Sequence, residues 1–156
     1  MATSTNSPAS SFIIGVDLGG TNIVVAAMSL DGTRLLGQQT APTLAAEGAE
    51  SVVQRMAQMV ARTIDTVVEE TGVPREAVLG VGLGAPGTVD RKQGLVLAAP
   101  NLRWSNYALT ERMTALTGLP VRIDNDANCA TYGEWWLGAA RGGTNVIGVT
   151  IGTGVG

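Results

Sequence analysis

The segment FIIGVDLGGTNIVVAAMS, residues 12–29, consists of two apolar runs separated by Gly19 and Gly20. Short apolar runs that end at glycines are typical of β-strands joined by a turn. We therefore predict two antiparallel strands, over residues 12–18 and 22–29. The chain is expected to open with a hairpin, and the elements that follow it decide the fold.

The rest of the chain alternates between strand patterns and helix patterns. Asp31-Gly32 marks a second hairpin turn before TRLLGQQT (33–40), which makes three consecutive strands. From Gly48 to Thr71 the apolar residues recur with a period of about 3.6, as in an amphipathic helix. Further strands are expected at residues 77–85, 121–124 and 145–152, a hairpin over 88–98, and helices at 107–117 and 127–137. This order predicts an α/β fold, a mixed sheet opened by a three-strand meander with helices packed on it.

The composition narrows the class of protein and of partner. A chain of 156 residues suits one domain with a real core, and 45% hydrophobic with 15% charged residues describes a globular protein. A net charge of −3 without a basic run argues against nucleic acid or an anionic membrane as partner, which leaves small molecules. No window approaches the roughly 18 consecutive apolar residues that a membrane-spanning helix needs.

The N-terminal segment and the cysteine content bear on location. Residues 1–11, MATSTNSPASS, are polar and aperiodic, so we expect a disordered tail followed by order from Phe12. The segment lacks the charged start and the apolar core of a secretory signal. The single cysteine, Cys129, allows no internal disulfide, and these features together predict a cytoplasmic protein. The chain has no histidine, so acid–base chemistry must use other side chains.

The glycine turn in VDLGGTN, residues 16–22, is a candidate phosphate site. Glycines let backbone N–H groups approach an anion that a Cβ atom would exclude, and Thr21 adds a hydroxyl donor. Asp17, at the end of the preceding strand, would face the same cleft and could hold Mg²⁺, directly or through water. The alternative is a plain hairpin in which Gly19 and Gly20 only satisfy the turn geometry.

A second glycine turn, IGTGVG at residues 151–156, also follows an apolar run. Together with the first turn it would make two clamps on a polyphosphate, with Gly152, Thr153 and Gly154 in the second clamp. The alternative is a frayed C-terminal segment, because the sequence stops within the motif.

The stretch GLGAPG, residues 82–87, fits the G-x-G-x-x-G expression of dinucleotide-binding folds. That fingerprint must open a helix, whereas Pro86 and the hairpin pattern after it do not. We therefore discount a nicotinamide or flavin site. The glycines would instead allow close approach of the backbone to a ligand or to a neighbouring helix.

Asp124-Asn125-Asp126 stands where a predicted strand gives way to a helix. Open α/β sheets bind ligands at the carboxyl ends of their strands. Asn125 offers a donor and an acceptor and Asp126 a strong acceptor, and such a pair fits neighbouring hydroxyls of a polyol or sugar. The alternative role of Asp126 is an N-cap whose carboxylate accepts from the N–H of Asn128 or Cys129.

Asp126 is also the best candidate base in a chain without histidine. Phosphoryl transfer to a hydroxyl has a loose transition state, so the carboxylate mainly orients the hydroxyl toward the γ-phosphate and takes its proton late. We assign Asp124 to structural support of the site, with a metal role as the lesser alternative. Trp135 and Trp136 are expected in the core or an interface, and Trp104 fits either a position beside a sugar or a core anchor.

Five segments occur in the order and spacing of one known family. GVDLGGTN, GLGAPGTVD, APNLRW, DNDANCATYGEW and TIGTGVG resemble motifs of the ROK family of bacterial sugar kinases, and look most like those of its glucokinases. The resemblance runs from Phe12 to Gly156. It implies the actin-like ATPase, or ribonuclease H-like, fold, with residues 12–156 as the N-terminal sugar-kinase lobe.

The same resemblance implies roles for individual residues. The first phosphate loop would span residues 15–22 and contain Asp17, Gly19, Gly20, Thr21 and Asn22, and the second would begin with Gly152, Thr153 and Gly154. Asn125 and Asp126 would bind the sugar, with Asp126 as the catalytic base for the 6-hydroxyl. Gly84 and Asn101 would lie near the sugar. ATP and Mg²⁺ are the implied cofactors, and a homodimer is the implied assembly.

The sequence also departs from the family pattern. Family members continue into a second lobe that completes the second phosphate loop, holds the adenosine, and carries a glutamate and a histidine for the sugar and a His/Cys zinc site. We expect that lobe to be absent, and a chain without histidine cannot contain that zinc site. Asn22 replaces the lysine that many relatives have after GGT, which removes a positive charge near the phosphates. A ROK repressor is disfavoured because the segment before Phe12 is too short for a helix-turn-helix.

The expected function is ATP-dependent phosphorylation of a hexose, with glucose converted to glucose 6-phosphate and this chain as the N-terminal lobe. The lobe alone is expected to be inactive or weak, because half of the phosphate clamp is missing. One alternative is a non-catalytic sugar- or nucleotide-binding module with the same fold. Another is an actin-like ATPase without sugar chemistry, although that function does not explain why the Asn125-Asp126 pair is present. The choice of hexose, and of ATP or polyphosphate as donor, stays open.

Overall fold

The computed structural model describes residues 10–151 of the chain. Its strands are β1 (Phe12–Leu18), β2 (Asn22–Ser29), β3 (Leu35–Pro42), β4 (Val78–Ala85), β5 (Thr88–Asp90), β6 (Leu95–Ala99), β7 (Trp104–Tyr107) and β8 (Val121–Asn125). Its α-helices are α1 (Ala49–Thr71), α2 (Leu109–Thr117) and α3 (Asp126–Trp136), and short 3-10 turns lie at Ala45–Glu47, Arg75–Ala77 and Pro100–Leu102. The predicted order of strands and helices is therefore confirmed through α3.

The opening meander forms as predicted. β1 pairs antiparallel with β2, and β2 pairs antiparallel with β3. Of the predicted tail, residues 1–9 lie outside the described part of the chain. Ser11, however, is buried, and its carbonyl oxygen accepts a hydrogen bond from the Leu30 N–H at 3.0 Å. Ordered structure therefore begins before Phe12, because Ser11 already packs against the end of β2.

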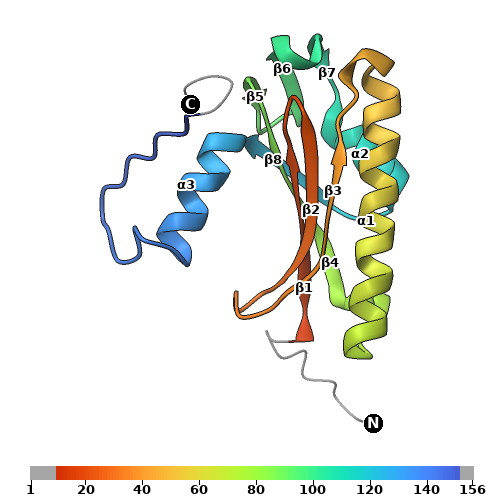
Figure 1. The fold of residues 1–156 in the computed structure, drawn as a ribbon, viewed down its shortest axis with the longest axis vertical. Helices are drawn as coiled ribbons and strands as arrows, with labels where there is room; N and C mark the ends of the chain where they lie inside the picture. The colour runs from red at the N-terminus through yellow and green to blue at the C-terminus, as the bar shows by residue number, and fades with distance from the viewer. Residues whose placement is uncertain (1–9, 152–156) are drawn as a thin grey trace.

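The main sheet is mixed and has the strand order β3-β2-β1-β4-β8. β1, β4 and β8 are parallel, and parallel neighbours need long crossover connections. α1 lies in the connection from β3 to β4, and α2 lies in the connection that leads to β8. Figure 1 shows both helices on the same face of the sheet, where α1 presents a buried stripe of Val52, Met56, Met59, Val60, Ile64 and Val67.

A small second sheet stands at one end of the main sheet, with the strand order β5-β6-β7. The hairpin predicted over residues 88–98 is confirmed as β5 and β6. The helix predicted from residue 107 begins instead at Leu109, because Trp104–Tyr107 pairs with β6 as a short strand. Trp104 is 6% exposed and its ring centroid lies 4.9 Å from that of Tyr107. These contacts favour the core-anchor role of Trp104 over a position beside a sugar.

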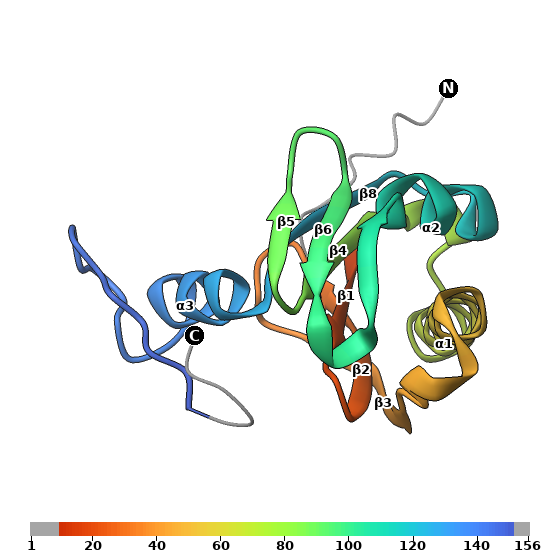
Figure 2. The same cartoon turned by 90° about the horizontal axis from the view of Figure 1, so that it is seen from above.

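α3 extends away from the sheet on the side opposite α1 and α2 (Figure 2). It contains no buried residue, and Trp135 and Trp136 are 42% and 39% exposed. The predicted core position of this pair is therefore wrong for the described part of the chain, and the predicted interface position stays a prediction.

The strand predicted over residues 145–152 is wrong for residues 145–150, which form no strand. Ile147 and Val149 are 92% and 65% exposed. An apolar pattern shows only that a segment can pair, and a strand forms only where a neighbour accepts its backbone hydrogen bonds. Gly152, Thr153 and Gly154 lie outside the described residues. No helix between residues 10 and 151 combines the length and apolar character that crossing a bilayer requires.

Candidate active site

Three parallel strands end at the same level of the main sheet. Asp17 of β1 is the register partner of Gly84 in β4, and Gly84 is the partner of Asp124 in β8. The glycine turn after β1, the Pro86-Gly87 turn after β4 and the N-terminus of α3 after β8 therefore leave the sheet at one edge. This is the edge at which open α/β sheets bind ligands.

The turn after β1 is narrow and leaves backbone donors unpaired. The Gly19 N–H donates to the Asn22 carbonyl oxygen at 2.9 Å, and a Cβ atom on Gly19 would stand 2.8 Å from that oxygen. Glycine is therefore required there. Among residues 10–151, the N–H groups of Gly20 and Thr21 find no acceptor. Free N–H groups on a glycine turn suit an anion, in line with the predicted phosphate loop.

Asn101 lies against this glycine turn. A Cβ atom on Gly20 would stand 3.3 Å from the Cβ atom of Asn101, so the two residues are in close contact. Asn101 belongs to the 3-10 turn Pro100–Leu102, between β6 and β7. The fold thus brings a predicted sugar-side residue next to the predicted phosphate loop, although the two are far apart in the sequence.

Thr43, just after β3, holds the glycine turn from its inner side. The residue is fully buried, and its hydroxyl donates to the Gly19 carbonyl oxygen at 2.7 Å. Its backbone N–H donates to the Thr21 carbonyl oxygen at 2.8 Å. Sequence reasoning misses this residue because the contact joins positions 24 apart through the β2–β3 pairing, and no local pattern indicates it.

The N-cap of α3 is Asn125, so the predicted capping role of Asp126 is wrong. The Asn125 side-chain oxygen accepts from the N–H groups of Ala127 at 3.0 Å and Asn128 at 3.2 Å, and its amide nitrogen donates to the Gly87 carbonyl oxygen at 3.0 Å. Both adjacent residues suit an N-cap, and Asn125 takes the role because its backbone is extended. Asp126 is the first helical residue, and its carboxylate accepts from the Ala127 N–H at 2.8 Å. Asp126 therefore keeps acceptor capacity for a ligand.

Gly84 lies directly beside the first turn of α3. A Cβ atom on Gly84 would meet the Cα atom of Asp126 and the sulfur of Cys129, each at 3.5 Å. The absence of a side chain on Gly84 lets α3 approach the end of β4 closely. Two residues predicted near the sugar, Gly84 and Asp126, are thus brought together.

The carboxylates of Asp17 and Asp126 interact across this edge. The pKa of Asp17 is raised above its ordinary value, first because the surrounding protein removes part of its water and second because Asp126 repels negative charge. Solvent still reaches Asp17 from the open side of the site. Close carboxylates with a raised pKa occur at functional sites more often than elsewhere, and they attract cations.

Cys129 lies close to the same group of carboxylates. The pKa of its thiol is raised by burial first, and then by the negative charges of Asp124, Asp17 and Asp126. A thiol with a raised pKa stays protonated near neutral pH and is a poor nucleophile. Cys129 is therefore a weaker candidate for chemistry at this edge than the carboxylates.

The residues at this edge fit magnesium only with help from other oxygen ligands. Within the described part of the chain, no group of three or more His, Cys, Asp or Glu side chains is arranged to hold a metal ion. Mg²⁺ usually keeps several waters and takes one or two carboxylates together with phosphate oxygens. Asp17 beside the free N–H groups of the glycine turn matches that arrangement.

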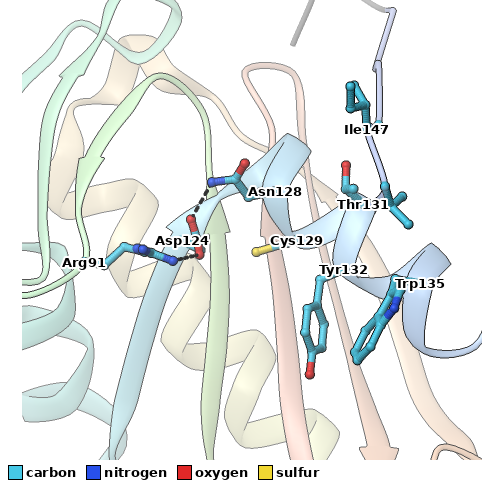
Figure 3. A pocket seen from close by; sticks show the side chains of 10 residues that line it. Arg91, Asp124, Asn128, Cys129, Thr131, Tyr132, Trp135 and Ile147 are labelled. Carbon is cyan, nitrogen blue, oxygen red and sulfur yellow. Dashed lines mark hydrogen bonds and ion pairs between the residues drawn. The ribbon is translucent and has the colours of Figure 1, made fainter. Parts of the chain in front are cut away.

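Asp124 is engaged by three neighbours, of which Figure 3 shows Arg91 and Asn128. Its carboxylate accepts from Arg91 Nη1 at 3.0 Å, Asn128 Nδ2 at 2.9 Å and the Asn125 N–H at 2.7 Å. Desolvation alone would raise its pKa, but the hydrogen bonds from Asn128, Asn125 and Arg91 outweigh it, so the pKa of Asp124 is lowered. These contacts agree with a supporting role. Sequence reasoning misses both side-chain contacts, because Asp124 lies in β8 while Asn128 lies in α3, and Arg91 has no local signal.

A cavity of about 720 Å³ opens beside Asp124. Its lining includes Arg91, Cys129, Thr131, Tyr132, Trp135 and Ile147. Neither Asn125 nor Asp126 lines this cavity. The cavity therefore adjoins the sheet edge at Asp124 and Cys129 but does not include the predicted sugar residues Asn125 and Asp126.

The fold is shared with a known class of proteins. The crystal structure of a ROK family glucokinase from Streptomyces griseus in complex with glucose and AMPPNP matches with a TM-score of 0.80 and 38% identity, over 94% of this chain and 43% of that chain. The fold is therefore α/β and of the actin-like ATPase type, as predicted.

Comparison of sequences gives the family. A model of the ROK family matches residues 13–156, and the chain belongs to this family. The glucokinase of Thermotoga maritima is 39% identical over 145 residues, which cover 92% of this chain and 43% of that protein. The xylose repressor of Caldicellulosiruptor bescii is 30% identical over 144 residues, 92% of this chain and 35% of that protein. The chain thus spans less than half of the length of these relatives.

Proposed function

We propose that this chain carries the sugar site and the first phosphate loop of an ATP-dependent hexose kinase that converts glucose to glucose 6-phosphate. The observation that supports this best is the register of Asp17, Gly84 and Asp124, which brings the glycine turn and the Asn125-Asp126 pair to one sheet edge. The complex of the Streptomyces griseus relative with glucose and AMPPNP supports the same class of reaction.

In the proposed reaction, Asp126 accepts the proton of the sugar 6-hydroxyl. The hydroxyl oxygen bonds to the γ-phosphorus, the bond from that phosphorus to the bridging oxygen breaks, and ADP leaves. Because the transition state is loose, the carboxylate contributes mainly by orienting the hydroxyl in line with the bond that breaks. The amide of Asn125 is fixed by Gly87, Ala127 and Asn128, so it would present its remaining N–H to the sugar in one orientation.

The donor phosphates would lie against the glycine turn. The free N–H groups of Gly20 and Thr21 and the hydroxyl of Thr21 are donors for phosphate oxygens. Asn22, at the start of β2, adds no positive charge, so neutralisation would come from Mg²⁺, held by Asp17 directly or through water. Gly152, Thr153 and Gly154 are proposed as the start of the second clamp.

Residues 12–156 alone are proposed to be a poor catalyst. Positioning and charge neutralisation have to come from both sides of the phosphates. The Thermotoga maritima and Streptomyces griseus relatives are more than twice as long as the segment they share with this chain. The activity is therefore proposed for the complete protein as its source makes it.

The test is to identify the product that the complete protein forms. It would be incubated with glucose or another hexose and with ATP or inorganic polyphosphate, and the products followed by phosphorus NMR. We expect glucose 6-phosphate, with one ADP released for each sugar phosphorylated. ATP hydrolysis that does not depend on sugar would contradict the proposal and favour an ATPase without sugar chemistry.

A second candidate is a non-catalytic module that binds sugar or nucleotide. The similarity to a xylose repressor favours it, because that relative also matches 92% of the chain. Calorimetric binding of a sugar by the complete protein, with no phosphorylated product under any of the conditions above, would support this candidate over the kinase.

A further inference from the structure

The glycine turn is held on its inner side by one buried hydroxyl, and we propose that Thr43 is a positioning residue for phosphate binding. Its role would be to keep the Gly20 N–H pointing toward the bound phosphate. The inference rests on the proposed function, because it assumes that this turn binds the donor nucleotide. Thr43 would touch neither substrate and would act only through the turn.

The argument begins with the peptide unit between Gly19 and Gly20. This unit is trans, and a trans peptide is planar, with its C=O and N–H pointing in opposite directions. The Thr43 hydroxyl binds the Gly19 carbonyl oxygen at 2.7 Å from the buried side of the turn. The Gly20 N–H must then point away from Thr43, and it has no acceptor within the described residues.

A peptide unit between two glycines rotates easily unless something holds it. Glycine adopts positive and negative φ angles almost equally, so the Gly19–Gly20 unit could turn over and remove its N–H from the phosphate side. The Thr43 hydroxyl opposes that rotation, because turning the carbonyl away would leave a buried donor unpaired. The second bond, from the Thr43 N–H to the Thr21 carbonyl oxygen at 2.8 Å, holds the other end of the turn.

Thr43 is itself fixed by α1. Arg55 of that helix donates from Nη1 to the Thr43 carbonyl oxygen at 2.8 Å. Arg55 also forms an ion pair with Glu47, and Glu47 accepts from the Ser51 hydroxyl at 2.9 Å. The turn is therefore connected through Thr43 to a 23-residue helix that packs on the sheet, and not to a free loop.

The experiment compares Thr43→Val, Thr43→Ser and a matched control in the complete protein. Valine keeps the shape and the backbone N–H bond but removes the hydroxyl, while serine restores it. The control is Thr63→Val, because Thr63 is also fully buried and its hydroxyl donates to the Gly37 carbonyl oxygen at 3.1 Å, away from the site. The Thr63 hydroxyl also accepts from Gln39 Nε2 at 2.7 Å, so this control removes at least as many hydrogen bonds as Thr43→Val. The readouts are the Kd for AMPPNP, the Kd for glucose and the thermal midpoint.

We expect Thr43→Val to weaken AMPPNP binding by about tenfold, the loss typical of a buried polar group left unpaired. Glucose binding should change by less than about twofold, Thr43→Ser should recover most of the AMPPNP affinity, and Thr63→Val should lower the thermal midpoint without weakening AMPPNP binding. Unchanged AMPPNP affinity in Thr43→Val, equal weakening in Thr63→Val, or no AMPPNP binding by the wild-type protein would overturn the inference. Nucleotide binding is measured without turnover, so a protein that binds AMPPNP but forms no sugar phosphate would refute the proposed function alone.

Discussion

Gly87 joins the two sheets at the edge that carries the candidate site. Its φ angle is 82°, and a Cβ atom there would collide with the carbonyl oxygen of Ala98 in β6. Its own carbonyl oxygen accepts from the Asn125 side chain, which caps α3. A residue that cannot carry a side chain thus fixes one of the two proposed sugar ligands.

Gly87→Ala is expected to destabilise the protein by at least about 2 kcal/mol, since it combines a strained backbone with overpacking. Gly72→Ala is the matched control, because Gly72 has a left-handed backbone (φ 70°, ψ 6°) but no atom within 4 Å of the added Cβ. The control should lose only about 1 kcal/mol, the cost of the left-handed backbone. Urea unfolding of both variants measures the difference, and equal losses would show that the contact with Ala98 contributes nothing.

Single residues also mark the limit of what the sequence predicts. Asn125 and Asp126 were correctly placed at a strand end, but two adjacent residues of similar capping strength could not be told apart without the backbone angles. Thr43 and Arg91 could not be predicted, because each acts on a residue more than 20 positions away. Asp17 could be singled out because a strand end before a glycine turn is a local pattern, whereas Gly84 and Asn101 came only from the family resemblance, and the proposed roles of all three stay predictions.

Among the elements, the pair of helices on one face of the sheet is joined by an ion pair between α1 and α2. Arg112 Nε lies 3.1 Å and 3.0 Å from the two carboxylate oxygens of Glu50, and Arg112 Nη2 also contacts this carboxylate. Hydrogen bonds from Arg112 first, and then from Gln54, lower the pKa of Glu50 to about 2. This exposed pair ties the N-terminus of α1 to α2.

The lowered pKa predicts how the pair responds to acid. A group whose folded pKa lies below its unfolded value of 4.5 stabilises the fold above pH 4.5 and loses that effect as the pH falls through about 2. Glu50→Gln should therefore lower the urea midpoint slightly at pH 7, and the difference from wild type should shrink between pH 4.5 and 2. Glu69→Gln, on an exposed position of the same helix, is the control. A difference that stays constant down to pH 2 would contradict the assignment.

Helices and strands were predicted correctly where the sequence has a clear periodicity or a glycine turn. The prediction failed where strand formation depends on a pairing partner that is distant in the sequence. The long α1 and the hairpin of β1 and β2 follow from local patterns. β7 was missed because its four residues, WSNY, carry no periodicity and form a strand only by pairing with β6. Residues 145–150 were wrongly predicted as strand for the opposite reason, since an apolar pattern without a paired neighbour does not make one.

At the scale of the whole molecule, the parallel arrangement of β1, β4 and β8 decides the site. It brings four segments that are distant in sequence, the glycine turn, the Gly84–Gly87 stretch, the Asn101 turn and the start of α3, to one place. The chain covers 43% of the length of its Streptomyces griseus relative, and we propose that it supplies one side of the complete site. The central claim is that Asp126 is the residue of this chain that accepts the proton of the sugar hydroxyl.

The most direct measurement is glucose-dependent ADP release by the complete protein carrying Asp126→Asn. The amide keeps the size of the carboxylate but cannot take the proton, so we expect kcat to fall by at least about a hundredfold, as for loss of a general base. Thermal midpoint and AMPPNP affinity should stay near wild type. Asp65→Asn, which alters an exposed carboxylate paired with Arg75, should retain full turnover. Turnover near the wild-type rate in Asp126→Asn would contradict the account.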